Sequence, residues 1–414
     1  MESCPTEGVA DPPLAVDADD GASASAADAT QQPTAAPLSF FHLRVGGAIR
    51  SVFTATAEFA EPTAAVPNNF TRGVKVAPDG LCVLTSSEDQ VLRLFDVPTD
   101  DASAPAAGEL RSSLQAKEGG AIYDFCWYPF MRSSDPTSCI FVSTSRDHPI
   151  HMWDAYSGAL RATYRAFDHL DEITAAFSVA FNATGDKIFA GYDRTIRVFD
   201  ITRPSRDFET RALCKTRRSR EGQRGIISTL HFNPALAHVY AAGSYNGTTY
   251  VYSEDTGEEI LCLRDHDGRG ITQVQFSPCG NYLYTAARRD ATINCWDVRH
   301  SLQVVQSFSR LADTNQRIEF DVHCTGRYLI AGSRDGRALL YDVPTGERVD
   351  ERLTMPDAVN GVSFFPDPTR ARVALTTGQR HFEIPGVDDS DDDEATHEPS
   401  GPRNALHVVE FEGE

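Results

Sequence analysis

Arginine recurs beside short polar turns and in the loops that lead into strand-like runs, and it is the residue of this chain best suited to binding chemistry. A guanidinium binds phosphate through a planar fork of N–H donors and stacks on a nucleobase, and a tyrosine adds a second stacking surface. The candidates are Arg72, Arg146, Arg194, Tyr192, Arg224, Tyr245, Arg269, Arg288, Arg289, Arg317, Arg334 and Arg380, accompanied by the amides Asn246, Asn315 and Gln316. This set predicts a face for an anionic ligand, and an unpaired stretch of RNA suits it best.

A simpler interpretation is that an arginine beside a turn aspartate pairs with that aspartate. It would explain Arg146, Arg289 and Arg334, but not the arginines of the approach loops, such as Arg72 and Arg317. We therefore favour a functional face.

Motifs for catalysis are absent from the sequence. There is no G-x-S-x-G turn, phosphate-cradling glycine loop, H-E-x-x-H pair or metal-spaced Cys/His set. His148 and His151 are three residues apart, but they lie in a turn and a strand, where that spacing directs the rings to opposite faces. We predict a protein that is not an enzyme, with no cofactor and no metal site.

A repeated unit must position the arginines. An Asp or Asn stands six residues before an aromatic residue in Asp89–Phe95, Asp147–Trp153, Asp193–Phe199, Asn246–Tyr252, Asp290–Trp296 and Asp335–Tyr341. Units of about 45 residues, each a set of short strands, cannot bury both faces alone and stack into a ring. The sequence predicts an all-β, seven-bladed WD40 β-propeller. Six blades are the alternative if the weak last unit, 360–384, is an appendage.

In repeats of this type the turn aspartate, an approach-loop histidine and the strand aromatic form a buried hydrogen-bond network. His266, Asp290 and Trp296 fit this structural network best, and Asp147 with Trp153 forms a partial one. Such a network specifies the blade and does not react. Approach loops and these turns leave a propeller at the same end, so the arginines are expected at one end of the ring.

The chain divides into four parts by composition. Residues 1–37 form an Ala/Asp/Pro-rich tail that we expect to be disordered, 38–385 the propeller, 386–402 a disordered acidic loop, and 403–414 a strand that could close the ring. The segment near 40–56 is the other candidate for closure.

The formal net charge of −21 argues against wholesale binding to a polyanion, so we expect no direct contact with DNA and a local basic face instead. No apolar run is long enough for a membrane span or a signal peptide, and the nine cysteines hold no C-x-x-C pair. A soluble intracellular protein without membrane contact is expected.

Three stretches are more particular than WD repeats in general: 122–129 (IYDFCWYP), 145–162 and 164–176. They closely resemble the telomerase Cajal body protein 1 family, and later segments agree in order, among them 314–318 (TNQRI) and 378–380 (GQR). The resemblance runs from about Phe59 to Arg380. It implies a non-enzymatic scaffold that binds the Cajal-body box of H/ACA-type small RNAs, telomerase RNA included, and directs the ribonucleoprotein to Cajal bodies or telomeres. The implied partners are these RNAs and the H/ACA ribonucleoprotein proteins, and the implied location is the nucleus.

Two other functions stay open from the residues. Trp296-Asp297-Val298-Arg299 matches the W-D-x-R element of propellers that act as substrate receptors of cullin-RING ubiquitin ligases. A generic peptide-binding WD40 scaffold is the third hypothesis.

Overall fold

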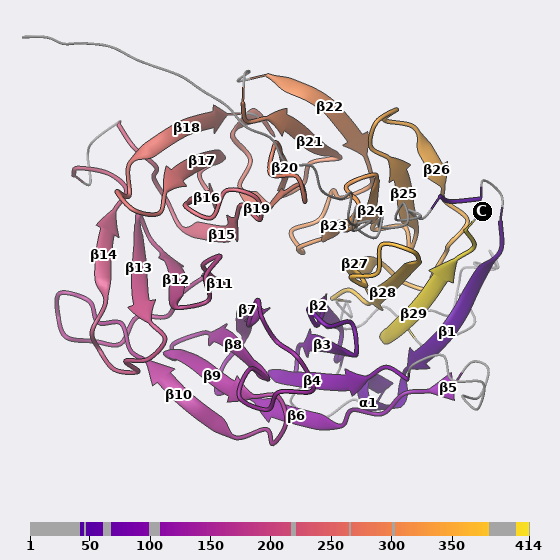
Figure 1. The fold of residues 1–414 in the computed structure, drawn as a ribbon, viewed down its shortest axis with the longest axis horizontal. Coiled ribbons are helices and arrows are strands. Elements are labelled where there is room, and N and C mark those ends of the chain that lie inside the picture. The colour runs from indigo at the N-terminus through magenta and orange to yellow at the C-terminus, as the bar shows by residue number, and fades with distance from the viewer. Residues whose placement is uncertain are drawn as a thin grey trace, which may run out of the picture. The chain divides into compact units, whose positions relative to one another are not determined.

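Seven sheets stand in a ring around a central axis in the computed structural model (Figure 1). The structure describes residues 42–44, 47–60, 68–98, 108–216, 221–264, 266–299, 303–380 and 403–413. The predicted seven-bladed WD40 propeller is therefore confirmed, and the six-bladed alternative is wrong. The tail at 1–37, the acidic loop at 386–402 and the end of the weak last unit, 381–384, lie outside the described residues.

Six blades each consist of four strands in antiparallel order. Blade 1 contains β2 (Thr71–Val76), β3 (Cys82–Ser87), β4 (Val91–Asp96) and β6 (Leu114–Lys117). Blade 2 contains β7 (Ile122–Trp127), β8 (Ile140–Ser145), β9 (Ile150–Asp154) and β10 (Leu160–Tyr164). Blade 3 contains β11 (Ser178–Phe181), β12 (Lys187–Tyr192), β13 (Thr195–Asp200) and β14 (Glu209–Ala212). Blade 4 contains β15 (Ile227–Phe232), β16 (Val239–Ser244), β17 (Thr248–Ser253) and β18 (Glu259–Arg264).

Blade 5 contains β19 (Ile271–Phe276), β20 (Tyr282–Ala287), β21 (Thr292–Asp297) and β22 (Val304–Ser309), and the short helix η1 (His266–Gly268) precedes it. Blade 6 contains β23 (Phe320–Val322), β24 (Tyr328–Gly332), β25 (Ala338–Asp342) and β26 (Arg348–Asp350). Blade 7 has the strand order β27 (Val359–Phe364), β28 (Ala371–Thr377), β29 (Ala405–Phe411), β1 (Ile49–Ala55) and β5 (Gly108–Glu109).

Both ends of the described chain close the ring. β29 pairs with β28 from Ala371 to Thr377, and β1 pairs with the other edge of β29 (Figure 1). The sequence left two candidates for one closing strand, and the structure uses both in the same blade. Closure buries the sheet faces that an open ring would leave exposed at blades 1 and 7, where Val83 and Phe95 share a core cluster with Leu406 and Val408.

The apolar core lies between neighbouring blades. Phe189 of blade 3, for example, packs against Phe232 and Tyr240 of blade 4 with ring centroids 4.8 and 5.1 Å apart. All three side chains are buried. The inner strands are buried on both faces, which explains why their sequences read as nearly continuous apolar runs rather than alternating ones.

The repeated Asp or Asn marks the turn between the second and third strand of a blade, and each turn contains a residue with positive φ. In blades 4 and 6 this residue is a glycine, in blades 1 and 2 it is Gln90 and Asp147, and in blades 3 and 5 it is Arg194 (φ 57°) and Arg289 (φ 55°). A side chain with a Cβ is disfavoured in the left-handed region. Blades 3 and 5 thus hold their arginines at a conformational cost.

The predicted network around Trp296 is present. His266 Nδ1 lies 2.8 Å from Asp290 Oδ2, and Thr285 Oγ1 joins His266 Nε2 (2.9 Å) to the indole N–H of Trp296 (3.0 Å). Burial by itself would raise the pKa of Asp290, but hydrogen bonds from His266 and Thr292 outweigh it and lower the pKa to about 2. The carboxylate is therefore charged and fixes the approach loop of blade 5.

The expected partnership of Asp147 with Trp153 is wrong. The Asp147 side chain is 84% exposed, and the Trp153 indole donates to Ser143 Oγ at 2.8 Å instead. The acid of this network is the buried Glu118, which accepts from Ser143 and Ser145 and lies 2.9 Å from His151 Nδ1. Glu118 comes from the approach loop, so in blade 2 an approach-loop acid takes over the place of a turn acid.

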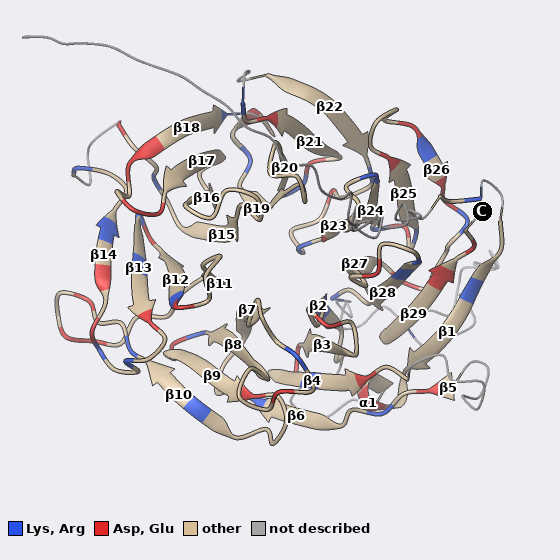
Figure 2. Cartoon of the chain, in the orientation of Figure 1, with Lys and Arg blue, Asp and Glu red and all other residues tan. Residues whose placement is uncertain are grey.

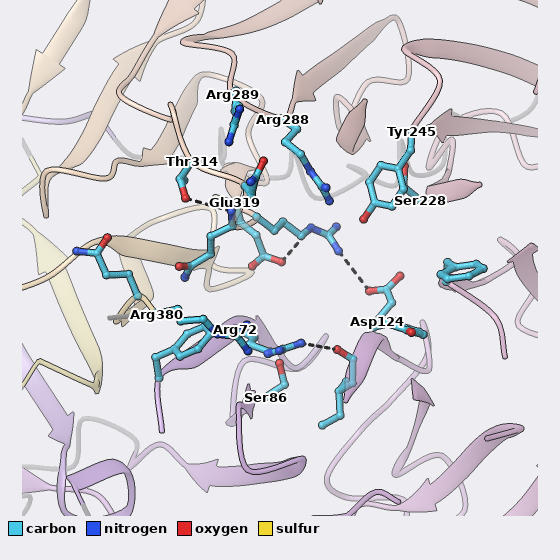
Figure 3. Close-up of a pocket in the computed structure, with 18 of the residues that line it drawn as sticks. Arg72, Ser86, Asp124, Ser228, Tyr245, Arg288, Arg289, Thr314, Glu319 and Arg380 are labelled. Atoms are coloured by element: carbon cyan, nitrogen blue, oxygen red, sulfur yellow. Dashed lines mark hydrogen bonds and ion pairs between the residues drawn. The ribbon is translucent and has the colours of Figure 1, made fainter. Parts of the chain in front are cut away.

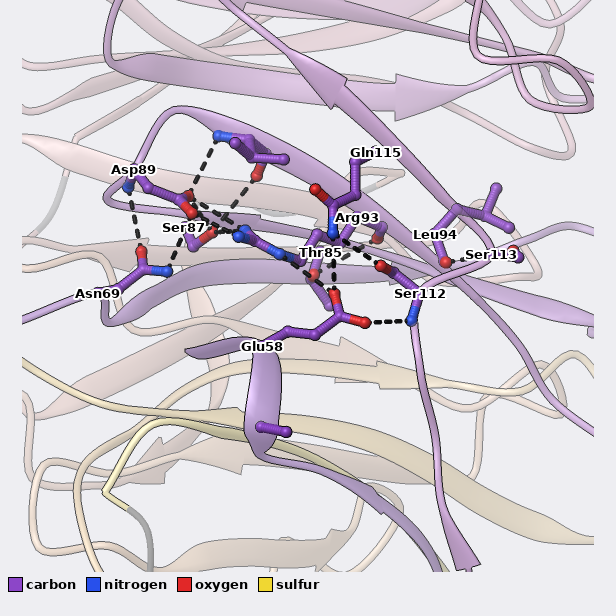
Figure 4. Close-up of polar contacts among 12 residues, drawn as sticks. Glu58, Asn69, Thr85, Ser87, Asp89, Arg93, Leu94, Ser112, Ser113 and Gln115 are labelled. Atoms are coloured by element: carbon purple, nitrogen blue, oxygen red, sulfur yellow. Dashed lines mark hydrogen bonds and ion pairs between the residues drawn. The ribbon is translucent and has the colours of Figure 1, made fainter. Parts of the chain in front are cut away.

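In blade 1 the polar network at the turn is built around a buried arginine (Figure 4). The guanidinium of Arg93 donates to Ser87 and Asp89, lies 3.4 Å from Glu58 of α1 (Ala57–Ala60), and stacks over the Phe59 ring. Arg93 stands four residues after Asp89, two before the repeat aromatic Phe95, at the position that Asn294 occupies in blade 5. The contact to α1 connects blade 1 to the segment that follows β1.

Charges of both signs are interspersed over the outer strands (Figure 2). β14, for example, carries Glu209 and Arg211, and β26 carries Arg348 and Asp350. Among the described residues, no helix has the length and apolarity that a bilayer crossing requires.

Candidate functional site

A pocket of about 850 Å³ opens over the axis of the ring, and every blade contributes to its wall. In blade order the contributions include Arg72, Tyr123, Phe177, Tyr245, Arg288, Arg317 and Arg380. Figure 3 shows Arg288 and Arg289 facing Arg72 and Arg380 across this pocket, with Tyr245 beside Arg288. Seven of the twelve candidates from the sequence line the pocket, since Arg289 and Arg334 belong to it as well.

A β-bulge aims several of these side chains at the axis. The register of the first two strands skips one residue at the second position of β2, β7 and β15, and the skipped residues are Arg72, Tyr123 and Ser228. All three line the pocket. A bulged residue is released from the alternation of the strand and points in a new direction, which is a common device beside functional sites.

Arg72 and Arg380 share one carboxylate. Arg72 Nε donates to Glu88 Oε2 at 2.7 Å, and Arg380 donates to Glu88 Oε1. The pair joins blade 1 to blade 7 at the point where the ring closes. Arg334 is held similarly by Asp313, with both oxygens within 2.8 Å of Nη1. The neighbouring turn acid, Asp335, pairs with Arg337 and not with Arg334.

Arg317 forms the floor of the pocket. Its guanidinium lies 3.7 Å from Glu319 and 3.9 Å from Asp124. Burial by itself would lower the pKa of Arg317, but these two acids outweigh it and raise the pKa. Burial raises the pKa of Glu319, against the opposing charges of Arg317 and Lys75. Below the floor, a smaller cavity of about 300 Å³ continues along the axis between the innermost strands.

Arg288 and Arg289 are the uncommitted cations of the pocket. Among the residues that the structure describes, neither guanidinium lies within ion-pair distance of a carboxylate. Arg288 lies over the ring of Tyr245, 4.6 Å from its centroid, and its Nε is buried without a hydrogen-bond partner. Arg289 is exposed. The pairing that the simpler interpretation assigned to Arg289 is therefore not formed, whereas Arg146 does approach Asp147 at 3.4 Å.

Aromatic side chains form the wall beside Tyr245. Tyr123 and Phe177, from blades 2 and 3, contact each other in a tilted arrangement, with ring centroids 5.2 Å apart and an interplanar angle of 32°. Neither was among the candidates from the sequence. The signal that could have found Tyr123 is its place in the repeat, because it occupies the bulged position that Arg72 occupies in blade 1.

Five candidates lie away from the pocket. Arg146 and Arg194 sit on their own turns and pair with Asp147 and Asp193, and Arg269 lies 3.7 Å from Asp290. Arg224 lines a separate hollow of about 540 Å³ with Asn246. The adjacent basic residues at 217–220 lie outside the described part of the chain.

Tyr192 is a correction. The expectation that its ring shares the exposed end is wrong, because the side chain is 5% exposed and belongs to the core between blades 2 and 3. The guanidinium of Arg197 covers it at 4.5 Å. Burial raises the pKa of Tyr192, so the hydroxyl stays neutral. Tyr192 is the last residue of β12, and side chains alternate between the two faces of a strand, so its ring faces the core. From the sequence alone, Tyr192 is expected in the exposed turn that follows.

Among the described residues, no group of three or more His, Cys, Asp or Glu side chains is arranged to hold a metal ion. The W-D-x-R arginine, Arg299, forms two hydrogen bonds to Asp297, at 3.0 and 2.7 Å, and lies over Tyr282. Its guanidinium is thus engaged by its own strand.

Comparison with known sequences places the chain among related proteins. The family model for the WD domain, G-beta repeat, matches residues 164–200 and 257–297, which cover parts of blades 3 and 5. Telomerase Cajal body protein 1 of Rattus norvegicus and of Homo sapiens are each 42% identical over 77% of this chain. The telomerase Cajal body protein 1 homolog of Drosophila melanogaster is 32% identical over 76%.

The chain spans about 60% of the length of these relatives (60, 59 and 58%, respectively). The resemblance predicted from the three particular stretches is confirmed: this protein is a relative of the telomerase Cajal body protein 1 family.

Proposed function

We propose that this protein is a non-enzymatic RNA-binding scaffold of the telomerase and Cajal-body type. Its pocket holds the single-stranded loop of an H/ACA-type small RNA, telomerase RNA among the candidates. The propeller then carries the ribonucleoprotein, through H/ACA ribonucleoprotein proteins on its outer faces, to a nuclear body. The observation that carries the proposal is the convergence of side chains from all seven blades on one pocket over the axis, among them seven of the twelve sequence-derived arginines and tyrosines.

The chemistry of the pocket suits a nucleotide loop better than a peptide. Among the described residues, Arg288 and Arg289 form no ion pair, although Arg289 acts on Asp313 from a greater distance, so a phosphate is the anion that can bind them directly. Tyr123, Phe177 and Tyr245 offer ring faces, which stack on unpaired bases of any sequence. A duplex hides its bases, so the rings would remain unused against double-stranded nucleic acid.

The acidic balance of the chain supports selectivity. With a net charge of −21, the protein repels polyanions except where the arginines outnumber the acids. The names of the relatives, which refer to telomerase and the Cajal body, favour the same class of RNA and the same nuclear compartment for this chain.

The test is RNA recovery from cells after crosslinking, with charge reversal at Arg288→Glu and Arg289→Glu. Both side chains lie on a turn without carboxylate partners, so the fold is expected to survive. Arg317 is a poorer target, because a glutamate there would meet Glu319 and Asp124. The matched control reverses Arg146 and Arg194, which lie on equivalent turns outside the pocket.

We expect the variant at Arg288 and Arg289 to lose H/ACA-type RNAs while the control retains them. Equal recovery of these RNAs by both variants would refute the proposal. Partners that persist after RNase treatment, without any crosslinked RNA, would favour the peptide-binding scaffold. The cullin-receptor alternative requires Arg299 to leave Asp297, and it predicts a cullin adaptor in the purified complex.

A further inference from the structure

We propose that the pocket divides its work between two sets of residues: Tyr245 and Arg288 form a stacking platform for one unpaired nucleobase, while Arg289 with Arg72 and Arg380 receives the flanking phosphates. The inference rests on the proposed function and adds to it which side chain meets which part of the nucleotide.

Arg288 differs from the other cations that stack on aromatic rings in the described residues. Arg72, Arg93, Arg206, Arg211, Arg299 and Arg327 each pair with a carboxylate as well as with a ring. Arg197 donates to the carbonyl of Phe167 and to Thr174. Among the described residues, the Arg288 side chain contacts the ring of Tyr245 and forms no hydrogen bond, and its Nε is buried. The plane of the Arg288 guanidinium is therefore held by stacking on Tyr245, and its N–H groups remain available to a ligand.

Tyr245 is presented to the pocket rather than packed away. It is 41% exposed, follows the last residue of β16, and its backbone is held by Ile226 O and by the close approach of Gly270. A Cβ at Gly270 would lie 2.9 Å from Tyr245 O, so the glycine permits this contact between blades 4 and 5. Figure 3 shows the Tyr245 hydroxyl and the Arg288 guanidinium directed into the same space.

The Arg288 guanidinium, lying flat on the Tyr245 ring, offers a surface on which a base can stack. The tyrosine holds the guanidinium plane, so the base meets a pre-oriented flat cation and loses less conformational freedom on binding. A lysine at this place would keep the charge but not the plane. Stacking of one base on such a surface contributes roughly a 5- to 150-fold change in affinity.

The three arginines that would receive the phosphates, Arg289, Arg72 and Arg380 (the phosphate set), act through their charge rather than through a stacked plane. Arg289 is exposed, forms no ion pair among the described residues and has a left-handed backbone (φ 55°). Arg72 and Arg380 share Glu88, so they form one cationic pair with a single balancing charge. A phosphate satisfies two such donors at once. Here charge rather than planarity matters, and lysine is an acceptable replacement for Arg289.

The experiment uses the full chain and an RNA hairpin whose apical loop comes from an H/ACA-type small RNA, with each loop position made abasic in turn. Affinities are measured for the wild type, Arg288→Lys, Tyr245→Phe, Tyr245→Ala and Arg289→Lys. We expect one abasic position to weaken wild-type binding by roughly 5- to 150-fold. Arg288→Lys and Tyr245→Ala should show the same loss with intact RNA and almost no further loss at that abasic position.

Tyr245→Phe and Arg289→Lys should bind as the wild type does, because the ring and the phosphate charge are retained. If the losses from Arg288→Lys and from the abasic position multiply, the platform does not contact a base and the inference is overturned. The same holds if Arg289→Lys and Arg288→Lys weaken binding equally. If the wild type fails to bind any hairpin, the proposed function itself fails, which is a distinct result.

Discussion

The guanidinium of Arg288 lies 4.6 Å from the centre of the Tyr245 ring, although the two residues belong to turns of neighbouring blades. The contact exists because the ring of blades brings equivalent turns side by side around the axis. It connects a repeated structural feature, the turn between the second and third strand, to a surface with binding chemistry.

Substitution of Arg289 is expected to change the stability of the fold and the affinity for RNA in opposite directions. Arg289→Gly relieves a left-handed residue and is expected to keep or raise the free energy of unfolding, by up to about 1 kcal/mol, while it weakens RNA binding. Arg194→Gly is the matched control, since Arg194 has nearly the same φ but lies outside the pocket. Urea unfolding and RNA affinity are measured for both. Loss of RNA binding in both variants would mean that the turns matter and the pocket does not.

Glu118 is expected to be a stability residue of blade 2. Glu118→Gln leaves the buried Ser143 and Ser145 and the half-buried His151 with an amide that cannot accept all their hydrogen bonds, at a cost of about 1–3 kcal/mol. The isosteric change Asp147→Asn, at a side chain that is 84% exposed, is expected to stay within about 0.5 kcal/mol. Urea unfolding distinguishes them, and equal effects would restore the turn aspartate as the network acid.

Salt dependence reports how many phosphates the pocket neutralises. For a single strand, the slope of log affinity against log salt is about −0.7 per phosphate contact. Arg289→Gln is expected to make the slope shallower by about 0.7, while Arg146→Gln leaves it unchanged. Titrations at several salt concentrations test this. An unchanged slope in Arg289→Gln would remove Arg289 from the phosphate set.

His407 is expected to make the fold acid-sensitive. Burial in β29 lowers its pKa from 6.5 to about 4, so between these values the unfolded chain takes up a proton that the folded chain does not. The free energy of unfolding therefore decreases as the pH falls, by at most about 1.4 kcal/mol per pH unit for this residue. His407→Leu is expected to flatten the dependence. Because His231 is shifted in the same direction, to about 4, part of the slope remains. Parallel pH profiles for the variant and the wild type would contradict the assignment.

The sequence predicted the blades well because the repeat is a local property. An acid or amide at a fixed distance from an aromatic residue, with a turn between them, is visible in six segments, and the ring follows from the need to bury both faces of each sheet. The network of His266, Asp290 and Trp296 is also local to one blade and was found. The network of Trp153 was assigned to the wrong acid, because an exposed Asp147 and a structural one look alike in sequence.

The sequence by itself determined the repeated blade unit, the turns that carry arginine and the family that the chain resembles. The tertiary structure decided between seven blades and six, because it shows that the last unit forms a full blade with strands from both ends of the described chain. The tertiary structure decided which arginines are free to bind, since an ion-pair partner such as Glu88 for Arg380 is almost three hundred residues distant and is set by closure of the ring. It also decided that Tyr123 faces the axis while Tyr192 is buried, because a bulge redirects one side chain and the strand period hides the other. Spacing along the chain fixes local geometry, but only the closed ring fixes which side chains share a pocket.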